Sequence, residues 1–130
     1  MKKSFIIILI LLIFSCEKSE ETNISKIIIY SVNFNIDTAV EVGCNDFEST
    51  FSKKIKMDSI KDKSTLNEFE TLLKNTKKSD QKTSLDVRKK IVVFYKNNSV
   101  DTLCIDRFNI MINNQVIDKD SNFLDYIIDL

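Results

Sequence analysis

Apolar positions open the domain in a pattern typical of β-strands. Residues 27–36 are mostly β-branched and aromatic, and every even position from 28 onwards is apolar, which predicts a strand. A turn at 37–38 would lead into a returning strand over 39–44, where Gly43, the only glycine, would mark a bulge. This region therefore predicts a β-hairpin.

The middle of the chain contains one clear amphipathic helix. Residues 45–63 have apolar side chains four or five positions apart, a spacing that fits either an irregular strand or a helical turn. A capping box at 65–68 is followed by apolar residues with helical spacing, so we expect a helix that ends near Asn75. The polar residues 76–86 are expected to form a loop.

The last third of the chain begins with a second predicted hairpin. Residues 91–95 and 100–105 read as strands on either side of 97–98, two asparagines that tolerate the left-handed angles of tight turns. A two-residue turn would place Ile91 opposite Cys104. That register puts Cys104 on a mostly apolar face of the sheet.

Two further strands and a helix complete the prediction. Strands over 108–112 and 115–117 would be joined by a turn at 113–114, and a short terminal helix would be capped by Asp120 or Ser121. The order of elements is β-β-α-β-β-β-β-α, which predicts an α+β fold with a largely antiparallel sheet.

A different pattern occupies the first sixteen residues. Two lysines precede an unbroken apolar run from Phe5 to Phe14, which is too short for a membrane-spanning helix of about 20 residues. Such a run is typical of a secretory signal peptide. The run ends in Ile13-Phe14-Ser15-Cys16, which resembles the lipobox of bacterial lipoproteins, whose cysteine accepts the lipid. An ordinary signal peptide with a chance cysteine is the alternative.

The resemblance implies three parts of the chain: a signal peptide over 1–15, a lipidated Cys16 with a polar tether to residue 25, and one domain over 26–130. The acidic residues directly after Cys16 are similar to the export signal of Bacteroidota-type lipoproteins. This implies an anchor in the outer membrane, with the cell surface favoured over the periplasmic face. The chain resembles the small lipoproteins of unknown function in such bacteria.

Composition and charge argue against several classes of binding site and catalytic site. The 130 residues hold 19 basic and 19 acidic side chains, and this zero net charge argues against a nucleic-acid partner. The lack of histidine excludes Ser-His and Cys-His catalysis and removes the commonest zinc ligand. One glycine cannot form a P-loop or a dinucleotide-binding turn. We therefore expect no enzyme, no metal and no cofactor; a hydrolase based on two carboxylates is a less favoured alternative.

Cys44 and Cys104 remain as a pair once Cys16 carries lipid. In an oxidising compartment they form a disulfide or stay as two separate buried thiols, and the sequence leaves both alternatives open. Closing a loop of about 60 residues would stabilise the fold by about 4 kcal/mol in the chain-entropy model.

Positive charge is concentrated between residues 53 and 90, which hold 12 basic and six acidic side chains. This segment would face an acidic envelope protein or an anionic glycan, or it would simply keep a helix and its loops solvated. The candidate partner-facing residues are Lys53, Lys54, Lys56, Lys74, Lys77, Lys78, Arg88, Lys89 and Lys90.

Two further motifs bear on glycosylation and calcium binding. Thr38 and Ser59 lie in Asp-Ser/Thr-aliphatic triplets that look like O-glycosylation sites of Bacteroidota-type exported proteins, with turn chemistry as the alternative. The acidic segment from Asp118 opens like a calcium loop, but Phe123 stands where the loop needs glycine, so a capped helix is the better interpretation.

The sequence favours a small outer-membrane lipoprotein that acts by binding, as a non-catalytic accessory protein. Its partner would meet the central lysines or an exposed edge of the sheet. The alternative is an inhibitor or immunity-type protein that binds an enzyme or a toxin.

Overall fold

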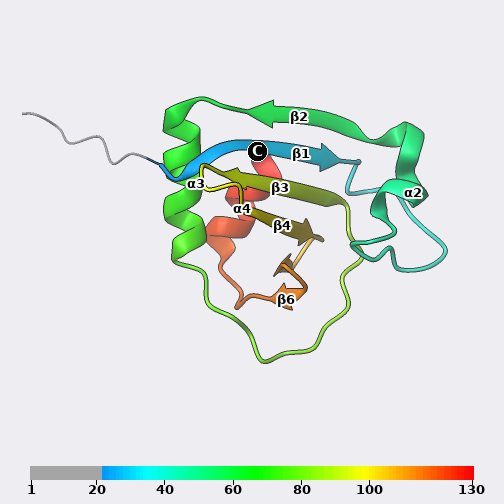
Figure 1. Cartoon of the computed structure of the whole chain (residues 1–130). Helices are drawn as coiled ribbons and strands as arrows, with labels where there is room; N and C mark the ends of the chain where they lie inside the picture. The colour runs from blue at the N-terminus through cyan, green and yellow to red at the C-terminus, as the bar shows by residue number, and fades with distance from the viewer. Residues whose placement is uncertain (1–21) are drawn as a thin grey trace, which may run out of the picture.

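A computed structural model describes residues 22–130, which form a six-stranded antiparallel sheet with helices on both faces (Figure 1). The strand order is β2-β1-β3-β4-β5-β6, and the α+β prediction is confirmed. The elements are β1 (Ile24–Ser31), α2 (Phe47–Phe51), the 3-10 helix η2 (Ser52–Lys54), β2 (Lys56–Ile60), α3 (Lys63–Lys74), β3 (Lys89–Tyr95), β4 (Val100–Ile105), β5 (Ile110–Ile112), β6 (Gln115–Val116) and α4 (Ser121–Asp129). The predictions for residues 1–21, including the lipobox at Cys16, lie outside the described residues.

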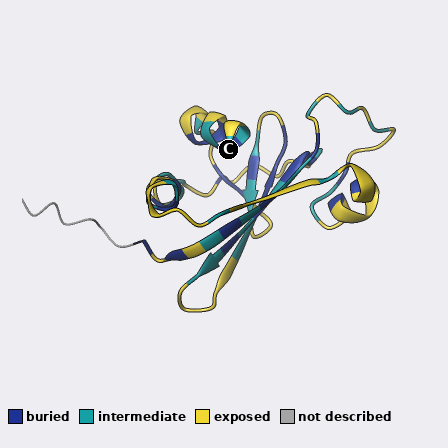
Figure 2. Cartoon of the chain, turned by 90° about the horizontal axis from the view of Figure 1, so that it is seen from above, coloured by how far each residue is buried: buried dark blue, intermediate teal, exposed yellow. Residues whose placement is uncertain are grey.

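Each face of the sheet has its own apolar core. Figure 2 shows α3 and α4 on one side, where Phe69 and Phe123 pack edge to face over buried residues such as Ile27 of β1. On the other side, Phe47 and Phe51 of α2 cover only one end of the sheet. Both faces are therefore buried at that end, where the consecutive residues Leu103, Cys104 and Ile105 of β4 are all buried.

The first predicted hairpin is wrong. β1 ends at Ser31, and residues 32–46 form a loop without strands, so Gly43 marks no bulge. β1 instead pairs antiparallel with β2, from the stretch whose pattern was ambiguous, and with β3 on its other side. The physical reason is that residues 39–44 make their contacts elsewhere: the Val42 N–H donates to Asp86 Oδ1, and Cys44 is bonded to Cys104.

The second predicted hairpin forms, but its register differs by one residue. Ile91 lies opposite Leu103, not Cys104, because the Tyr95 N–H bonds to the Ser99 carbonyl and leaves a three-residue loop. A shift of one residue moves every side chain to the other face. Cys104 therefore points toward α2, where Cys44 reaches it.

The helices and asparagine turns follow the local signals closely. α3 begins earlier than predicted, because Asp62 caps it by accepting the Thr65 N–H at 2.9 Å. Asp120 caps α4 as predicted. Asn98 adopts positive φ, as do both residues of the predicted turn at 113–114. Within residues 22–130 no helix is long and apolar enough to cross a lipid bilayer.

A buried carboxylate on α3 holds the residues just before β1, and we call this end of the sheet the tether end. Glu70, only 7% exposed, accepts the Thr22 hydroxyl at 2.6 Å and the Asn23 N–H at 2.9 Å. Burial would raise the pKa of Glu70, but these hydrogen bonds and Lys74 lower it to about 2. The predicted tether to residue 25 is therefore too long, since Thr22 and Asn23 are already fixed and Ile24 opens β1.

Candidate functional site

Arg88 organises the opposite end of the sheet. Its side chain is 4% exposed, and its guanidinium forms two hydrogen bonds with Asp86, at 2.6 and 2.7 Å. Nε donates to the Ile36 carbonyl and Nη2 to the Thr38 hydroxyl, both at 3.1 Å. With a further bond to the Val87 carbonyl, all five donors are used. Arg88 thus holds together two segments that are fifty residues apart in the sequence.

The 32–46 loop is fixed by further contacts. The Val42 N–H donates to Asp86 Oδ1, and the Val42 carbonyl accepts the Val87 N–H, each at 2.9 Å. The disulfide between Cys44 and Cys104, with Cα atoms 5.8 Å apart, joins the loop to β4. Fifteen residues without helix or strand are therefore held by cross-links at Ile36, Thr38, Val42 and Cys44. Long ordered loops of this kind are usually functional.

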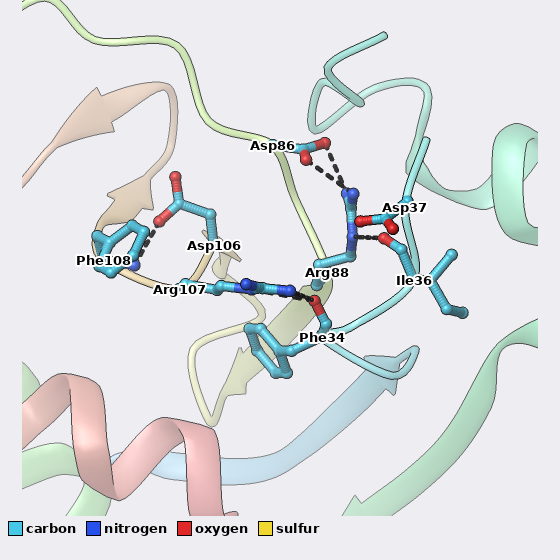
Figure 3. Close-up of a pocket in the computed structure, with 8 residues that line it drawn as sticks. All are labelled: Phe34, Ile36, Asp37, Asp86, Arg88, Asp106, Arg107 and Phe108. Carbon is cyan, nitrogen blue, oxygen red and sulfur yellow. Dashed lines mark hydrogen bonds and ion pairs between the residues drawn. The ribbon is translucent and has the colours of Figure 1, made fainter. Parts of the chain in front are cut away.

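A pocket of about 250 Å³ opens beside this loop (Figure 3). Three segments supply its walls: the loop after β1, the residues before β3 and the turn between β4 and β5. We call this side of the molecule the pocket end. The lining residues are Phe34, Ile36, Asp37, Asp86, Arg88, Asp106, Arg107 and Phe108. A wider hollow of about 600 Å³ beside residues 79–84 has no aromatic side chain in its lining.

Two of the pocket carboxylates are occupied by the protein itself. Partial burial would raise the pKa of Asp86, but the hydrogen bonds from Arg88 and the Val42 N–H lower it. Asp106 accepts the N–H groups of Phe108 and Asn109, at 2.7 and 2.6 Å, and so shapes the turn that carries Phe108. Both acids are therefore structural groups.

The groups left for a ligand are aromatic and charged. Phe108 is 63% exposed, an unusual position for a large apolar side chain. Arg107 is exposed but fixed, because Nε and Nη2 donate to the Phe34 carbonyl at 3.1 and 2.6 Å (Figure 3). Asp37 is exposed on the opposite rim. The arrangement suits binding, since a pre-positioned arginine and two phenylalanines combine planar polar recognition with apolar contact.

The structure separates the predicted basic residues. Arg88 and Lys89 are buried, so the prediction that they face a partner is wrong. The Lys89 ammonium caps α4 by donating to the carbonyls of Ile127 and Ile128, and burial lowers its pKa. Lys90 is half-buried and bonds to Glu48 at 2.6 Å.

The other basic residues stay exposed but lie on different sides of the molecule. Lys53 and Lys54 form η2 beside α2, and Lys56 follows at the start of β2. Lys74 ends α3, where it pairs with Glu70 at 3.1 Å, and Lys77 and Lys78 come shortly after it. Figure 1 places α2 and the end of α3 on opposite sides of the sheet. The nine residues therefore do not form one patch.

The two candidate glycosylation residues have different surroundings. Thr38 is half-buried, and its hydroxyl accepts a hydrogen bond from Arg88. Ser59 is exposed on β2, not in a loop. Within residues 22–130, no group of three or more cysteine or acidic side chains is placed to hold a metal ion.

Sequence reasoning did not identify the pocket. Phe108 lies in the predicted strand over 108–112, whereas β5 begins at Ile110, and a single arginine such as Arg107 carries little signal in a sequence. Asp106 is the available clue in the sequence. An aspartate side chain often accepts the backbone N–H groups two and three residues later, here those of Phe108 and Asn109, and this forms a turn that exposes the residues between.

A comparison with models of protein families, with curated proteins and with solved structures finds no match to this chain.

Proposed function

We propose that the protein is an exported lipoprotein, anchored in the outer membrane through Cys16, whose domain binds a partner at the pocket end. The anchor is supported by the lipobox-like segment at 13–16 and the signal-like run before it. Binding is supported by the pocket, with Phe108 exposed and Arg107 fixed beside it.

One observation carries the proposal: Thr22, the first described residue, and the pocket lie at opposite ends of β1. Residues 16–21 extend at most about 20 Å, so a lipid on Cys16 keeps Thr22 close to the membrane. β1 has eight residues and runs about 26 Å from the tether end to the pocket end. A lipid anchor therefore leaves the pocket accessible to a partner.

The acids at the pocket favour binding over hydrolysis. A hydrolase with two carboxylates needs one of them protonated near neutral pH, which requires a raised pKa. Asp86 is a pocket acid, and although partial burial would raise its pKa, the hydrogen bonds from Arg88 and the Val42 N–H lower it. Arg88 and backbone N–H groups also occupy the oxygens that a substrate or water would need.

Membrane fractionation tests the anchor. Wild-type protein should be found in the membrane fraction. The Cys16→Ala variant should be released from it, because the thiol that accepts the lipid is gone. A single acyl chain binds only marginally, so firm retention of the wild type also indicates more than one chain. A C16A protein that is processed and retained like the wild type would contradict the anchor.

Capture from intact envelopes tests the pocket. Phe108→Ser and Arg107→Ala should each lose a partner that the wild type retains, because both side chains line the pocket. Phe108 is mostly exposed, and Arg107 bonds to the Phe34 carbonyl and the Asn35 side chain. Val100→Thr is the matched control, since it changes an exposed apolar residue at the tether end. A stable envelope partner supports the accessory role, and a secreted enzyme or toxin supports the inhibitor alternative. Equal capture by all variants would contradict binding at the pocket.

A further inference from the structure

The two edges of the sheet differ in whether another segment of the chain covers them. Along β6, the chain returns to cover the edge: the Ser79 N–H donates to the Val116 carbonyl, and Lys78 bridges Ile117. β2 forms the other edge, along the top of Figure 1, and no described strand pairs with its outer side. Open edges are templates for pairing with another chain, which is why proteins usually protect them.

The pairing pattern shows which groups of β2 point outward. Hydrogen bonds of an antiparallel strand alternate between its two neighbours. The Val32 N–H bonds to the Arg88 carbonyl on the β3 side, so the odd-numbered residues of β1 bond to β2. Their partners are the even-numbered residues of β2, which leaves the N–H and C=O groups of Met57 and Ser59 for an additional strand.

The charges of β2 disfavour two of the two-fold pairings of this edge with itself. A pairing centred on Asp58 places two carboxylates opposite each other, and one centred on Lys56 does the same with two ammonium groups. Like charges directly opposite are destabilising. Centring on Met57 instead places Lys56 of each copy opposite Asp58 of the other, and it also pairs the outward groups of Met57.

We propose that β2 is a self-complementary edge through which two copies of this chain pair antiparallel about Met57. Met57 is 66% exposed and has the half-buried Tyr30 beside it on β1, so the two methionines would contact each other on an apolar stretch. The contact is much smaller than the roughly 1,600 Å² of a standard stable complex. The dimer is therefore weak in solution and is strengthened when the copies share a surface that raises their effective concentration.

Cysteine trapping tests the pairing on the full chain, in membranes and after purification. The Cys44–Cys104 bond leaves the thiol introduced by Met57→Cys as the reactive thiol of the domain, and the parent chain provides the blank for Cys16. Met57→Cys should give a disulfide-linked dimer, since directly paired residues have Cα atoms about 5.5 Å apart, within disulfide range. Ser59→Cys is the matched control, because in this register the two Ser59 positions are roughly 13 Å apart.

A charge exchange in the Met57→Cys background tests the register independently. Lys56→Asp and Asp58→Lys should each lower the dimer yield about fivefold, because each creates two like-charge pairs. The double exchange should restore the yield, which also shows that the exchanged strands fold. Equal trapping at positions 57 and 59, no response to the exchange, or trapping of the Met57→Cys variant on a different protein would overturn the proposal.

Discussion

The tether end and the pocket end are each organised around one buried charged side chain, but these residues hold very different structures. At the tether end, Glu70 of a regular helix accepts hydrogen bonds from Thr22 and Asn23, just before β1. At the pocket end, Arg88 fixes an irregular loop by donating to the Ile36 carbonyl and the Thr38 hydroxyl. Glu70 fixes the residues just before β1, and Arg88 helps to fix fifteen residues that have no helix or strand hydrogen bonds.

The difference shows what an irregular surface requires. A helix or strand satisfies its own backbone groups, whereas a loop needs side chains and cross-links to do so. Here the cross-links are Arg88, Asp86 and the Cys44–Cys104 bond, with Arg107 also donating to the Phe34 carbonyl, and they leave the exposed Phe108 available for a partner. A surface ordered before binding loses less conformational entropy when it binds.

Breaking the disulfide at the pocket end should cause the largest loss of stability. Reduction should lower the free energy of unfolding by about 4 kcal/mol, because the bond closes a loop of 60 residues. Urea unfolding with and without reductant measures the loss. The Cys44→Ala/Cys104→Ala variant should match the reduced protein and no longer respond to reductant. A loss below about 1 kcal/mol would mean that hydrogen bonds alone hold the pocket end.

Arg88→Ala should have the second largest effect and lower the free energy of unfolding by about 3 kcal/mol. The variant loses five hydrogen bonds, and Asp86 loses its charged partner. Arg88→Lys keeps the charge but not the planar fork, so it should lose roughly half as much. Urea unfolding of both variants provides the measurement. If the lysine variant is as stable as the wild type, charge and not geometry holds the loop.

Glu70→Gln probes the tether end. It should lower the free energy of unfolding by about 2 kcal/mol near neutral pH, because the ionised acceptor is lost. The pKa of Glu70 falls from its ordinary 4.5 to about 2 in the folded protein. Its contribution is therefore present above about pH 4.5 and is lost as the pH falls toward 2.

The matched control is Glu68→Gln, which changes an exposed acid on the same helix. Stability curves between pH 2 and pH 6 should be flatter for E70Q than for E68Q. Parallel curves for the two variants would show that Glu70 does not hold the first residues of the domain.

Phe108→Ser should have the smallest effect on stability, within about 0.5 kcal/mol, since the side chain is mostly exposed. Thermal unfolding compares the variant with the wild type. A loss above about 1 kcal/mol would indicate that Phe108 is a packing residue. Its effect on binding would then need to be separated from an effect on the fold.

Local signals predicted the elements that depend on neighbours in the sequence. The cap of α4 at Asp120 and the asparagine turn at 113–114 both satisfy backbone groups within a few residues. The partner of β1 could not be predicted in this way. Residues 39–44 have a suitable strand pattern, but the Val42 N–H and Cys44 bond to partners more than forty residues away. Such contacts leave no trace in local periodicity.

The candidate site was hidden for a related reason. Arg88, Lys89 and Lys90 read as one basic run, yet alternation along a strand sends neighbours to opposite faces. Arg88 meets Asp86 beneath the loop, Lys89 caps α4 across the sheet, and Lys90 pairs with Glu48 of α2. Charge is visible in a sequence, but the burial that decides its use is set by the tertiary fold.

Amide hydrogen exchange at Val42 tests the central claim, that the pocket end is an irregular loop held rigid before binding. The Val42 N–H donates to Asp86 Oδ1 and should exchange slowly, in contrast to the exposed neighbours Ala39 and Val40. Protection should fall in Arg88→Ala while the amides of β1 keep theirs. Exchange at Val42 as fast as at Val40 in the wild type would contradict the account.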